Sequence, residues 1–454
     1  MATPRLKQTQ RMILRLFLLG SEERIKKIVP NLRPQEIAGI LAHLRKPDQI
    51  RFLNLLFEMH LAGTTLHELP EEIAREFIQE LPNETLSQIV RRVPPDDAVD
   101  FLGYLSEARQ EEILATLDEK ERWTLERLRL YDDDTAGGLM TTEYITLPQE
   151  IRVSEAIQTL RDRYRDSDLL YIYVIDDRNR LTGTLPVRNL VFSGAETKVR
   201  DLVVEDPVTV HPDTPQEDVA KHVSDFDLLA VPVVDEEGRI LGVVTFDDIM
   251  DVIEEEATED MYRLAGLDTA ERVFTSVYRS VRLRAPWLFI NLGTAMLAAL
   301  TVSLFKESIS RYVALAVMMP IVANLGGNAG SQSLTVVVRG MALGELKFSR
   351  RWKAILKEST VGLCTGSING LIMGLIAYVW YRNLWLSLIL LLAMIANLIL
   401  AGLFGALVPL LLRWAGKDPA LGSHIFVTTV TDVAGFFIFL GLATLMMGRL
   451  ALGF

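Results

Sequence analysis

Residues 419–448 read PALGSHIFVTTVTDVAGFFIFLGLATLMMG, thirty residues in which Asp432 is the only Asp, Glu, Lys or Arg. About 20 apolar residues cross the hydrocarbon core of a bilayer as an α-helix. A run of this length has no natural place in a soluble core, so it predicts a membrane-spanning helix. The aspartate lies within this run, where a charged side chain costs at least ~2.5–3.5 kcal/mol, and such a residue is by default a functional candidate.

Four further windows without charged residues precede this run and predict four more spans. They cover residues 285–305, 312–338, 359–381 and 383–412. Basic residues near the ends of spans lie preferentially on the cytoplasmic side. Eleven of them lie on the side of the N-terminal half and four on the other side. We therefore expect a multi-pass protein of the cell (inner or plasma) membrane, with a cytoplasmic N-terminal half and an extracytoplasmic C-terminus.

The charge of the chain divides at the same place. Residues 286–454 hold 12 Lys and Arg and 5 Asp and Glu, a net charge of +7. The whole chain of 454 residues carries −12, so residues 1–285 carry −19. Such different halves do not share one solvent, which excludes a single globular domain and a disordered chain. The acidic half repels nucleic acid, so we expect no nucleic-acid partner.

Two polar features in the membrane half resist an explanation by packing alone. The segment LGGNAGSQS, residues 325–333, interrupts the second span, which favours the wall of a water-filled passage over a helix contact. In the fifth span, threonine hydroxyls including that of Thr428 adjoin Asp432, and we expect the amides of Asn328 and Gln332 to face them across the bundle. Oxygen ligands of this kind suit Mg²⁺ or Ca²⁺. The alternative is a protonated aspartate with a purely structural hydrogen bond.

The third span repeats glycine at every fourth position, which lines one helix face with hydrogen atoms. Such a face lets a neighbouring helix approach closely. We interpret it as a packing surface and not as a chemical site. The glycines are Gly362, Gly366, Gly370 and Gly374.

The first part of the cytoplasmic half contains an internal repeat. Between residues 66 and 120 a leucine or valine recurs every twelve residues, and three of these precede proline. Proline at the first turn with an acidic or Asn residue close behind it marks a helix start. We therefore expect residues 1–130 to form an all-α domain of short stacked helices. The repeated positions are Leu69, Leu81, Val93, Leu105 and Leu117.

Residues 138–200 and 201–259 are two similar α/β units. Each has an amphipathic helix, an apolar strand, an acidic turn, and then a second strand and helix. The expected first helices cover 153–164 and 215–225, and the expected first strands cover 171–175 and 229–234. Two such β-α-β-β-α units in tandem resemble a pair of cystathionine-β-synthase (CBS) domains.

The complete order of motifs resembles the MgtE family of magnesium channels. It runs from the helical repeats through DTAGGLM at 134–140, two CBS units and EATED at 256–260 to five spans with GGNAGSQ at 326–332 and Thr431-Asp432. The resemblance covers nearly the full length. It implies an all-α N-terminal domain, an α/β CBS pair and an all-α five-helix transmembrane domain over residues 285–454. A connecting or plug helix over residues 260–284 would link the last two.

The resemblance also implies a Mg²⁺ channel or transporter that is a homodimer in membrane lipid, not an enzyme. Its pore would lie on the twofold axis and be lined mainly by the second and fifth spans. Asp432 would bind the permeating Mg²⁺, with Asn328, Gln332 and Thr428 as further pore residues. The cytosolic domains would close the pore when intracellular Mg²⁺ is high.

The residues give this regulation a physical basis. Residues 247–260 contain eight carboxylates and no basic residue. Two unit charges ~4 Å apart repel by about 4 kcal/mol at an effective dielectric constant of 20, so a bridging divalent cation would favour a compact, closed state. A solvated acidic helix without a specific site is the alternative. The family pattern implies regulatory ligands at Asp96, Asp100, Glu217, Asp227, Asp248, Asp251, Glu256, Glu259 and Asp260, and a further ligand at Asp418 beside the connecting helix.

Some CBS pairs of this family bind ATP. The matching positions here are Tyr171, Arg188, Asn189, Leu228 and Asp247. The family commonly has an acidic residue in place of Asn189 and an aromatic residue in place of Leu228. These two departures weaken the expected ribose contact and adenine stack, so ATP is a doubtful ligand.

Other functions stay open on the residues alone. The same oxygen ligands would serve a transporter of another divalent cation such as Co²⁺, or one driven by protons through Asp432. A membrane sensor, in which the spans only anchor the CBS pair, would show no ion flux. An intramembrane aspartyl hydrolase needs two carboxylates in one site, and Asp432 is the only acid within a predicted span. An ATP-driven pump is disfavoured because the chain has no GxxxxGK[ST] loop.

Overall fold

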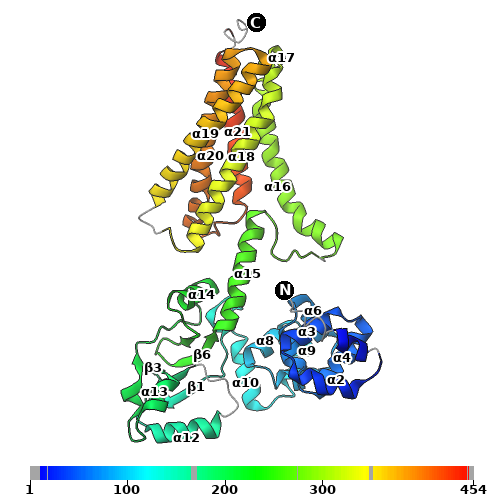
Figure 1. Cartoon of the computed structure of the whole chain (residues 1–454), viewed down its shortest axis with the longest axis vertical. Helices are drawn as coiled ribbons and strands as arrows, with labels where there is room; N and C mark the ends of the chain where they lie inside the picture. The colour runs from blue at the N-terminus through cyan, green and yellow to red at the C-terminus, as the bar shows by residue number, and fades with distance from the viewer. Residues whose placement is uncertain are drawn as a thin grey trace. The chain divides into compact units, whose positions relative to one another are not determined.

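The structure, a computed structural model, describes residues 11–17, 19–164, 171–273, 275–346, 351–446 and 448. It contains two compact units, one that ends at Glu254 and one that begins at Glu255. The first unit holds short helices and two α/β domains, and the second holds the long apolar helices (Figure 1).

The N-terminal part of the first unit consists of short helices around one apolar core. Three of them, α6, α7 and α8, begin directly after a proline, and α10 begins with a capping box in which Glu121 N donates to Asp118 Oδ1 at 2.7 Å. The helices are α2 (Glu22–Ile28), the 3-10 helix η1 (Val29–Asn31), α3 (Pro34–His43), α4 (Lys46–Glu58), α5 (Ala62–His67), α6 (Glu71–Glu80), α7 (Asn83–Val90), α8 (Pro95–Gly103), α9 (Glu107–Leu114) and α10 (Glu119–Leu128).

The twelve-residue repeat marks where the later helices of this domain begin. Each of its five positions lies two residues before the first residue of a helix, from α6 to α10. Leu69, Leu81, Val93 and Leu105 are buried, and Leu117 packs against the same core while partly exposed. The buried side chain holds the turn in place, and the proline or polar residue behind it starts the next helix. The prediction of short stacked helices is therefore confirmed.

Two α/β domains follow, joined to the helical domain through α11 (Ala136–Leu139). In the first, β1 pairs with β2 in parallel, and β2–β3 and β3–β4 are antiparallel; in the second, β5 and β6 form an antiparallel pair. The first domain contains β1 (Ile145–Pro148), α12 (Val153–Arg163), β2 (Ile172–Ile175), β3 (Leu181–Leu185), α13 (Val187–Phe192), the 3-10 helix η2 (Val199–Leu202) and β4 (Val204–Glu205). The second contains α14 (Gln216–Asp225), β5 (Ala230–Val234), β6 (Ile240–Thr245) and the start of α15 (Phe246–Leu264).

The acidic turns of the two α/β domains have the same hydrogen bonds. Asp176 Oδ1 accepts from the backbone N–H groups of Arg178 and Arg180, and Asp235 Oδ1 accepts from those of Glu237 and Arg239. In each turn the arginine Nε also donates a hydrogen bond to Oδ2 of the same aspartate. The two α/β domains therefore share local structure as well as sequence pattern, which supports the internal repeat expected from the sequence.

The second unit is a bundle of long helices in which α20 packs against α18, α19 and α21, and α16 packs against α21 (Figure 1). Among the described residues, α16, α19, α20 and α21 are long and apolar enough to cross a membrane. Helix α18 has a similar length of 29 residues and carries the polar segment around Asn328. The helices are α16 (Val277–Ser303), α17 (Lys306–Arg311), α18 (Ala314–Ala342), α19 (Arg351–Tyr381), α20 (Leu384–Trp414) and α21 (Ser423–Leu445).

The glycine face of α19 lies against the backbone of α20, as the four-residue spacing predicts. A Cβ atom on Gly362 would stand 2.2 Å from Leu398 O, and one on Gly366 would stand 2.9 Å from Ile395 Cα. From the opposite helix, a Cβ on Gly402 would stand 2.3 Å from Glu358 O. Backbone cannot yield to such contacts as a side chain can, so only glycine permits this approach.

The expected single connecting helix over residues 260–284 is wrong. Helix α15 continues from the second α/β domain to Leu264, and α16 begins at Val277 and runs on into the apolar span. Gly266 has φ +69°, and Leu267 N donates to Tyr262 O at 2.9 Å, which together form a Schellman-type helix end. This glycine stops the helix because it adopts the left-handed conformation without steric penalty.

We expect Gly362→Ala to separate α19 from α20, because its new methyl group meets backbone atoms. Overpacking of this kind costs about 1–3 kcal/mol. The measurement is the melting temperature of the purified protein in detergent, which should fall for this variant. Gly293→Ala on α16 is the matched control, since nothing lies within 4 Å of its added Cβ, and an equal fall in both variants would contradict the packing argument.

Candidate ion-binding sites

Polar side chains of α18 line up on its exposed face. Asn324, Asn328 and Gln332 recur at every fourth residue and are not buried, which places them on one side of the helix. Asn328 Nδ2 donates to Asn324 Oδ1 at 3.0 Å. The amide oxygen of Asn328 can therefore still accept a hydrogen bond, for example from water bound to an ion.

Helix α21 contributes a matching row of His424, Thr428 and Asp432, again four residues apart. The two rows meet, because a hydrogen bond of 2.8 Å joins Ser331 Oγ and His424 Nδ1. One turn further on, a Cβ on Gly327 would lie 3.6 Å from Thr428 Cγ2. We call the combined surface the polar strip; its residues are Asn324, Asn328, Ser331, Gln332, His424, Thr428 and Asp432.

Asp432 is half-buried on this strip, and no described residue donates a hydrogen bond to its carboxylate or forms an ion pair with it. A structural aspartate would need such a donor. Of the neighbouring threonines, Thr431 is fully buried and Thr429 lies on a groove beside α16. Only Thr428 therefore shares the face of Asp432, with its hydroxyl donating to His424 O at 2.9 Å.

Behind the strip, α20 holds α18 and α21 together through Asn397, a residue that the sequence analysis did not single out. Asn397 is fully buried, and its Nδ2 donates to Val322 O at 2.9 Å. Its amide also fills the space where Cβ atoms would stand on Gly326 and Gly435, with the nearest atoms at 2.3 and 2.8 Å. The available signal was a lone asparagine in an otherwise apolar span.

A second membrane-embedded acid was also missed. The window boundary at residue 359 left Glu358 outside the predicted span, whereas the structure buries it within α19 at 4% exposure. Ser333 Oγ donates to Glu358 Oε2 at 2.8 Å, and Lys357 pairs with the other carboxylate oxygen. With both oxygens satisfied, Glu358 links α18 to α19 and differs from Asp432, whose carboxylate has no such partner in the described part of the chain.

In the first unit, acids of the helical domain face acids at the start of α15. Burial, and then the charges of Asp97 and Asp248, raise the pKa of Asp96 to about 7. Burial raises the pKa of Asp248 to about 6, against a hydrogen bond from Thr245. Burial raises the pKa of Glu68; the charge of His67 opposes this shift and the charge of Asp251 adds to it. We call this group the acidic cluster; its residues are Glu68, Asp96, Asp97, Asp100, Asp248 and Asp251.

The acidic cluster has the features of a cation site. Asp96 Oδ1 is buried and has no hydrogen-bond partner among the residues described, which leaves a negative oxygen uncompensated. Burial of the carboxyl group, and then the charges of Asp97 and Asp133, raise the pKa of Asp100 to about 7. The described residues nevertheless contain no group of three His, Cys, Asp or Glu side chains already gathered around one metal position. A divalent ion would therefore have to draw these carboxylates closer.

A histidine supplies part of the missing positive charge. His67 Nδ1 lies 2.7 Å from Asp97 Oδ1. This hydrogen bond raises the pKa of His67 to about 9, although burial opposes the shift. A protonated His67 therefore neutralises one acid of the cluster, and the sequence analysis gave it no role because it is not part of a local metal motif.

Two of the expected regulatory ligands lie apart from each other. Glu217 is in the first turn of α14 and Asp227 follows the end of that helix, both exposed. Glu217 lies eight residues before the end of the helix at Asp225, roughly 12 Å along its axis. We therefore do not expect these two side chains of one chain to hold the same ion.

Four further expected ligands belong to the second unit, where Arg263 alters their interpretation. Arg263 pairs with both Glu259 and Asp418, and its carbonyl accepts from Gly422 N at 3.4 Å. The end of α15 is therefore tied by an arginine to the loop before α21, in the place where a metal ion was expected. Arg263 lies three residues beyond the acidic window at 247–260, so that window alone does not reveal it. Glu256 and Asp260 lie on the same helix.

The expected nucleotide positions lie on both α/β domains. Tyr171 Oη accepts from Leu229 N at 3.5 Å, so this pair joins the two domains. Asn189 Nδ2 donates to Leu202 O at 3.0 Å, and Thr245 donates to Asp247. Arg188 is exposed. The Asn189 amide group is thus already hydrogen-bonded within its own domain.

Comparison with known proteins gives matches along most of the chain. A family model described as a divalent cation transporter, MgtE, matches residues 319–442; the MgtE intracellular N domain matches 32–134, and the CBS domain matches 136–195 and 199–255. The chain is 34% identical over 437 residues to the magnesium transporter MgtE of Thermus thermophilus, covering 94% of this chain and 96% of that one. It is 36% identical over 329 residues to the magnesium transporter MgtE of Enterococcus faecalis, covering 72% of each. Among solved structures, it is similar to the cytosolic domain of the Mg²⁺ channel MgtE in complex with ATP, at 32% identity and a TM-score of 0.50, covering 54% of this chain and 99% of that one.

The raised pKa values predict that protons replace a cation in the acidic cluster. Carboxylates with raised pKa values stabilise the packed cluster at low pH and lose this contribution as pH rises through about 7; His67 loses its own as pH rises through about 9. Without Mg²⁺, hydrogen exchange in α8 and the start of α15 of the full-length protein should therefore be slower at pH 6 than at pH 9, once both are corrected for the intrinsic exchange rate.

Added Mg²⁺ should slow this exchange more at pH 9 than at pH 6, because ionised carboxylates bind the cation. Asp96→Asn should reduce the pH dependence, and Asp225→Asn, at the end of α14, is the matched control. Corrected exchange that is the same at both pH values would contradict the assignment of these shifts.

Proposed function

Because this chain belongs to the MgtE family of magnesium transporters, we propose that it carries Mg²⁺ across a membrane along the polar strip, with Asp432 as the residue that binds the passing ion. The protein is a transporter and not an enzyme. The observation that carries the proposal is the half-buried carboxylate of Asp432, without a described partner, in line with Thr428 on α21 and beside the amides of α18.

The chemistry of the strip fits an ion that keeps most of its water. Mg²⁺ dehydrates reluctantly and prefers six oxygen ligands in octahedral geometry. One carboxylate supplies charge, while the oxygens of Asn328, Gln332 and Thr428 accept hydrogen bonds from water on the ion. In a homodimer, a twofold axis beside the strip would bring two copies of Asp432 to one ion. A pore formed in this way selects by charge and by oxygen ligands, not by soft donors.

Intracellular Mg²⁺ regulates transport through the acidic cluster in this proposal. At neutral pH Asp96, Asp248 and their neighbours repel one another once ionised, and a bridging Mg²⁺ turns that repulsion into attraction. The compact arrangement of the helical and CBS domains then depends on bound Mg²⁺ and corresponds to a closed pore. Glu217 and Asp227 would hold separate ions, because they lie near opposite ends of α14.

Helix α15 supplies a covalent path from the cluster to the pore. Asp248 and Asp251 lie in its first turns, and it continues without interruption to Leu264. At its end Arg263 pairs with Asp418, five residues before the start of α21. We propose that Glu256 and Asp260 hold regulatory Mg²⁺ on this helix, whereas Glu259 and Asp418 act through Arg263.

Nucleotide regulation has less support in these residues. The related cytosolic domain is solved with ATP, yet Asn189 and Leu228 stand where the family commonly has an acid and an aromatic residue. Asn189 is also engaged with Leu202 O. We infer that ATP binds the CBS pair weakly at most, and that Mg²⁺ is the principal regulatory ligand.

Asp432→Asn should lower Mg²⁺ uptake by more than about tenfold, because a hydrogen bond or contact to a charged group contributes about 1.5–3 kcal/mol. The measurement is Mg²⁺ flux into proteoliposomes, with Co²⁺, Ca²⁺ and a proton gradient varied separately. Glu345→Gln, an acid after α18 that is not buried, is the matched control. Full Mg²⁺ flux through the Asp432 variant at equal protein content would exclude this residue from the pathway.

Asp96→Asn together with Asp248→Asn should shift inhibition by cytoplasmic Mg²⁺ to roughly tenfold higher concentration, since each removes charge from the bridged cluster. Patch-clamp recording with graded Mg²⁺ on the cytoplasmic side measures the shift. Asp225→Asn, an exposed acid at the end of α14, is the comparison variant and should leave the inhibition unchanged. An inhibition curve identical to that of the wild type would defeat the sensor model while leaving the transport proposal intact.

A further inference from the structure

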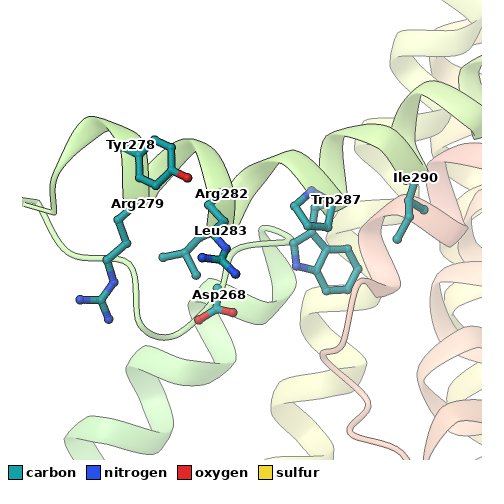
Figure 2. A pocket seen from close by; sticks show the side chains of 8 residues that line it. Asp268, Tyr278, Arg279, Arg282, Leu283, Trp287 and Ile290 are labelled. Carbon is teal, nitrogen blue, oxygen red and sulfur yellow. The ribbon is translucent and has the colours of Figure 1, made fainter.

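A hollow of ≈ 760 Å³ lies beside the first turns of α16, outside the polar strip and the acidic cluster. Figure 2 shows it between α16 and the loop that follows α15, with Arg279, Arg282 and Trp287 extending from α16 on the side of the loop. Its lining includes Asp268, Tyr278, Arg279, Arg282 and Trp287. Neither the transport pathway nor the regulatory proposal uses any of them.

The hollow lies at the depth of lipid headgroups. The charge-free part of α16 begins at Ala285 and ends at Ser303, and 19 residues of helix span about 28 Å, close to the ~30 Å hydrocarbon core. Arg282 lies three residues before this part, roughly 5 Å further along the helix. Trp287 lies at its edge, where tryptophan is enriched in membrane proteins.

The two arginines in the hollow carry charge that the described residues do not neutralise. No ion pair within the described ranges involves Arg279 or Arg282, and both are exposed. Their neighbour Arg284 instead pairs with the buried Glu271 at 2.7 Å. Asp268 also lines the hollow and accepts a hydrogen bond from Ala270 N. Arg279, Arg282 and Asp268 together carry a net charge of +1.

Hydrogen bonds hold the loop that forms one wall of the hollow against α16. Glu271 Oε1 accepts from Ser280 Oγ at 2.7 Å as well as from Arg284, which fastens the loop onto α16. Trp287 packs on Gly422, where an added Cβ would stand 2.7 Å from the indole ring. Gly422 has φ +60° and directly precedes α21. The hollow is thus held in place by the helix that carries Asp432.

We propose that this hollow binds the phosphate headgroup of an anionic phospholipid, with Arg279 and Arg282 on the phosphate and Trp287 beside the first acyl carbons. The occupant follows from charge complementarity and from depth: paired cationic side chains at the headgroup level attract anionic lipid, and arginine binds phosphate through two parallel hydrogen bonds. Phe289 and Leu288, 71% and 63% exposed, continue the apolar surface along which an acyl chain would lie. The proposal depends on α16 spanning a membrane and not on Mg²⁺ transport.

The test measures quenching of Trp287 fluorescence by brominated lipids in full-length protein reconstituted into phosphatidylcholine vesicles. The Trp287 component is the difference between wild type and Trp287→Phe. Brominated phosphatidylglycerol should quench it more than brominated phosphatidylcholine at the same mole fraction. Arg279→Gln with Arg282→Gln should lose this preference by roughly fivefold for each arginine. Equal quenching by both lipids in wild type would overturn the proposal.

Three further variants test whether the charge of the hollow sets the lipid preference. Arg279→Lys with Arg282→Lys keeps the charge and should retain a weakened preference, which distinguishes lost binding from lost folding. Asp268→Asn should strengthen the preference, because it removes the negative charge from the hollow. Arg311→Gln, an exposed arginine on α17 beyond the far end of the span, should leave it unchanged.

Two outcomes would assign the hollow to another occupant. Loss of the preference on adding soluble glycerol phosphate would identify a site for free phosphate and overturn the lipid assignment. Absence of any quenching by either lipid would show that lipid does not reach Trp287, as expected if a second copy of the chain covers it, and would also overturn the proposal. Mg²⁺ flux measured on the same vesicles keeps this result separate from the proposed function, since the arginine variants should still transport Mg²⁺.

Discussion

A carboxylate within a bilayer has to meet water, a cation or a hydrogen-bond donor, because hydrocarbon offers none of these. Asp432 meets no donor among the described residues, and the packing of the bundle keeps its face open. Asn397 closes α18 and α21 together from behind, and the glycine face of α19 brings α20 close enough to hold them. Glu358 shows the contrasting solution, in which Ser333 and Lys357 satisfy a buried acid that links helices. This difference between the two acids supports the proposed ion-binding role of Asp432 and a packing role for Glu358.

The acidic cluster in the first unit poses the same physical problem outside the membrane. Its carboxylates are desolvated by packing and repel one another, so their pKa values rise, and His67 gains a proton at higher pH. A proton stabilises the packed arrangement, and Mg²⁺ would do the same under the proposed regulation. Since α15 begins in this cluster and ends at the Arg263–Asp418 pair, a change of charge at one end of the helix bears on the loop that leads into α21.

Much of the architecture was predictable because it follows local rules. Charge-free windows predicted the long helices, and the twelve-residue repeat predicted the starts of α6 to α10. The paired α/β units follow from alternating strands and matching acidic turns around Asp176 and Asp235. The prediction of one connecting helix was wrong because Gly266 takes a left-handed conformation that ends α15. A single glycine does not reveal that conformation from the sequence. Glu358 was missed because a window of uncharged residues has to stop at a charge, whether or not that charge is buried.

The sequence by itself determined where the chain is apolar enough for a membrane, where helices begin, and that one aspartate lies among uncharged residues. These properties depend on the composition and period of a single segment. Only the tertiary structure decided which polar groups meet: that Ser331 joins His424, that Arg263 occupies the place between Glu259 and Asp418, and that Asp96 faces Asp248. The reason is that the energy of a charge depends on all its neighbours in space, and groups 155 positions apart, as Arg263 and Asp418 are, become neighbours only when the helices pack.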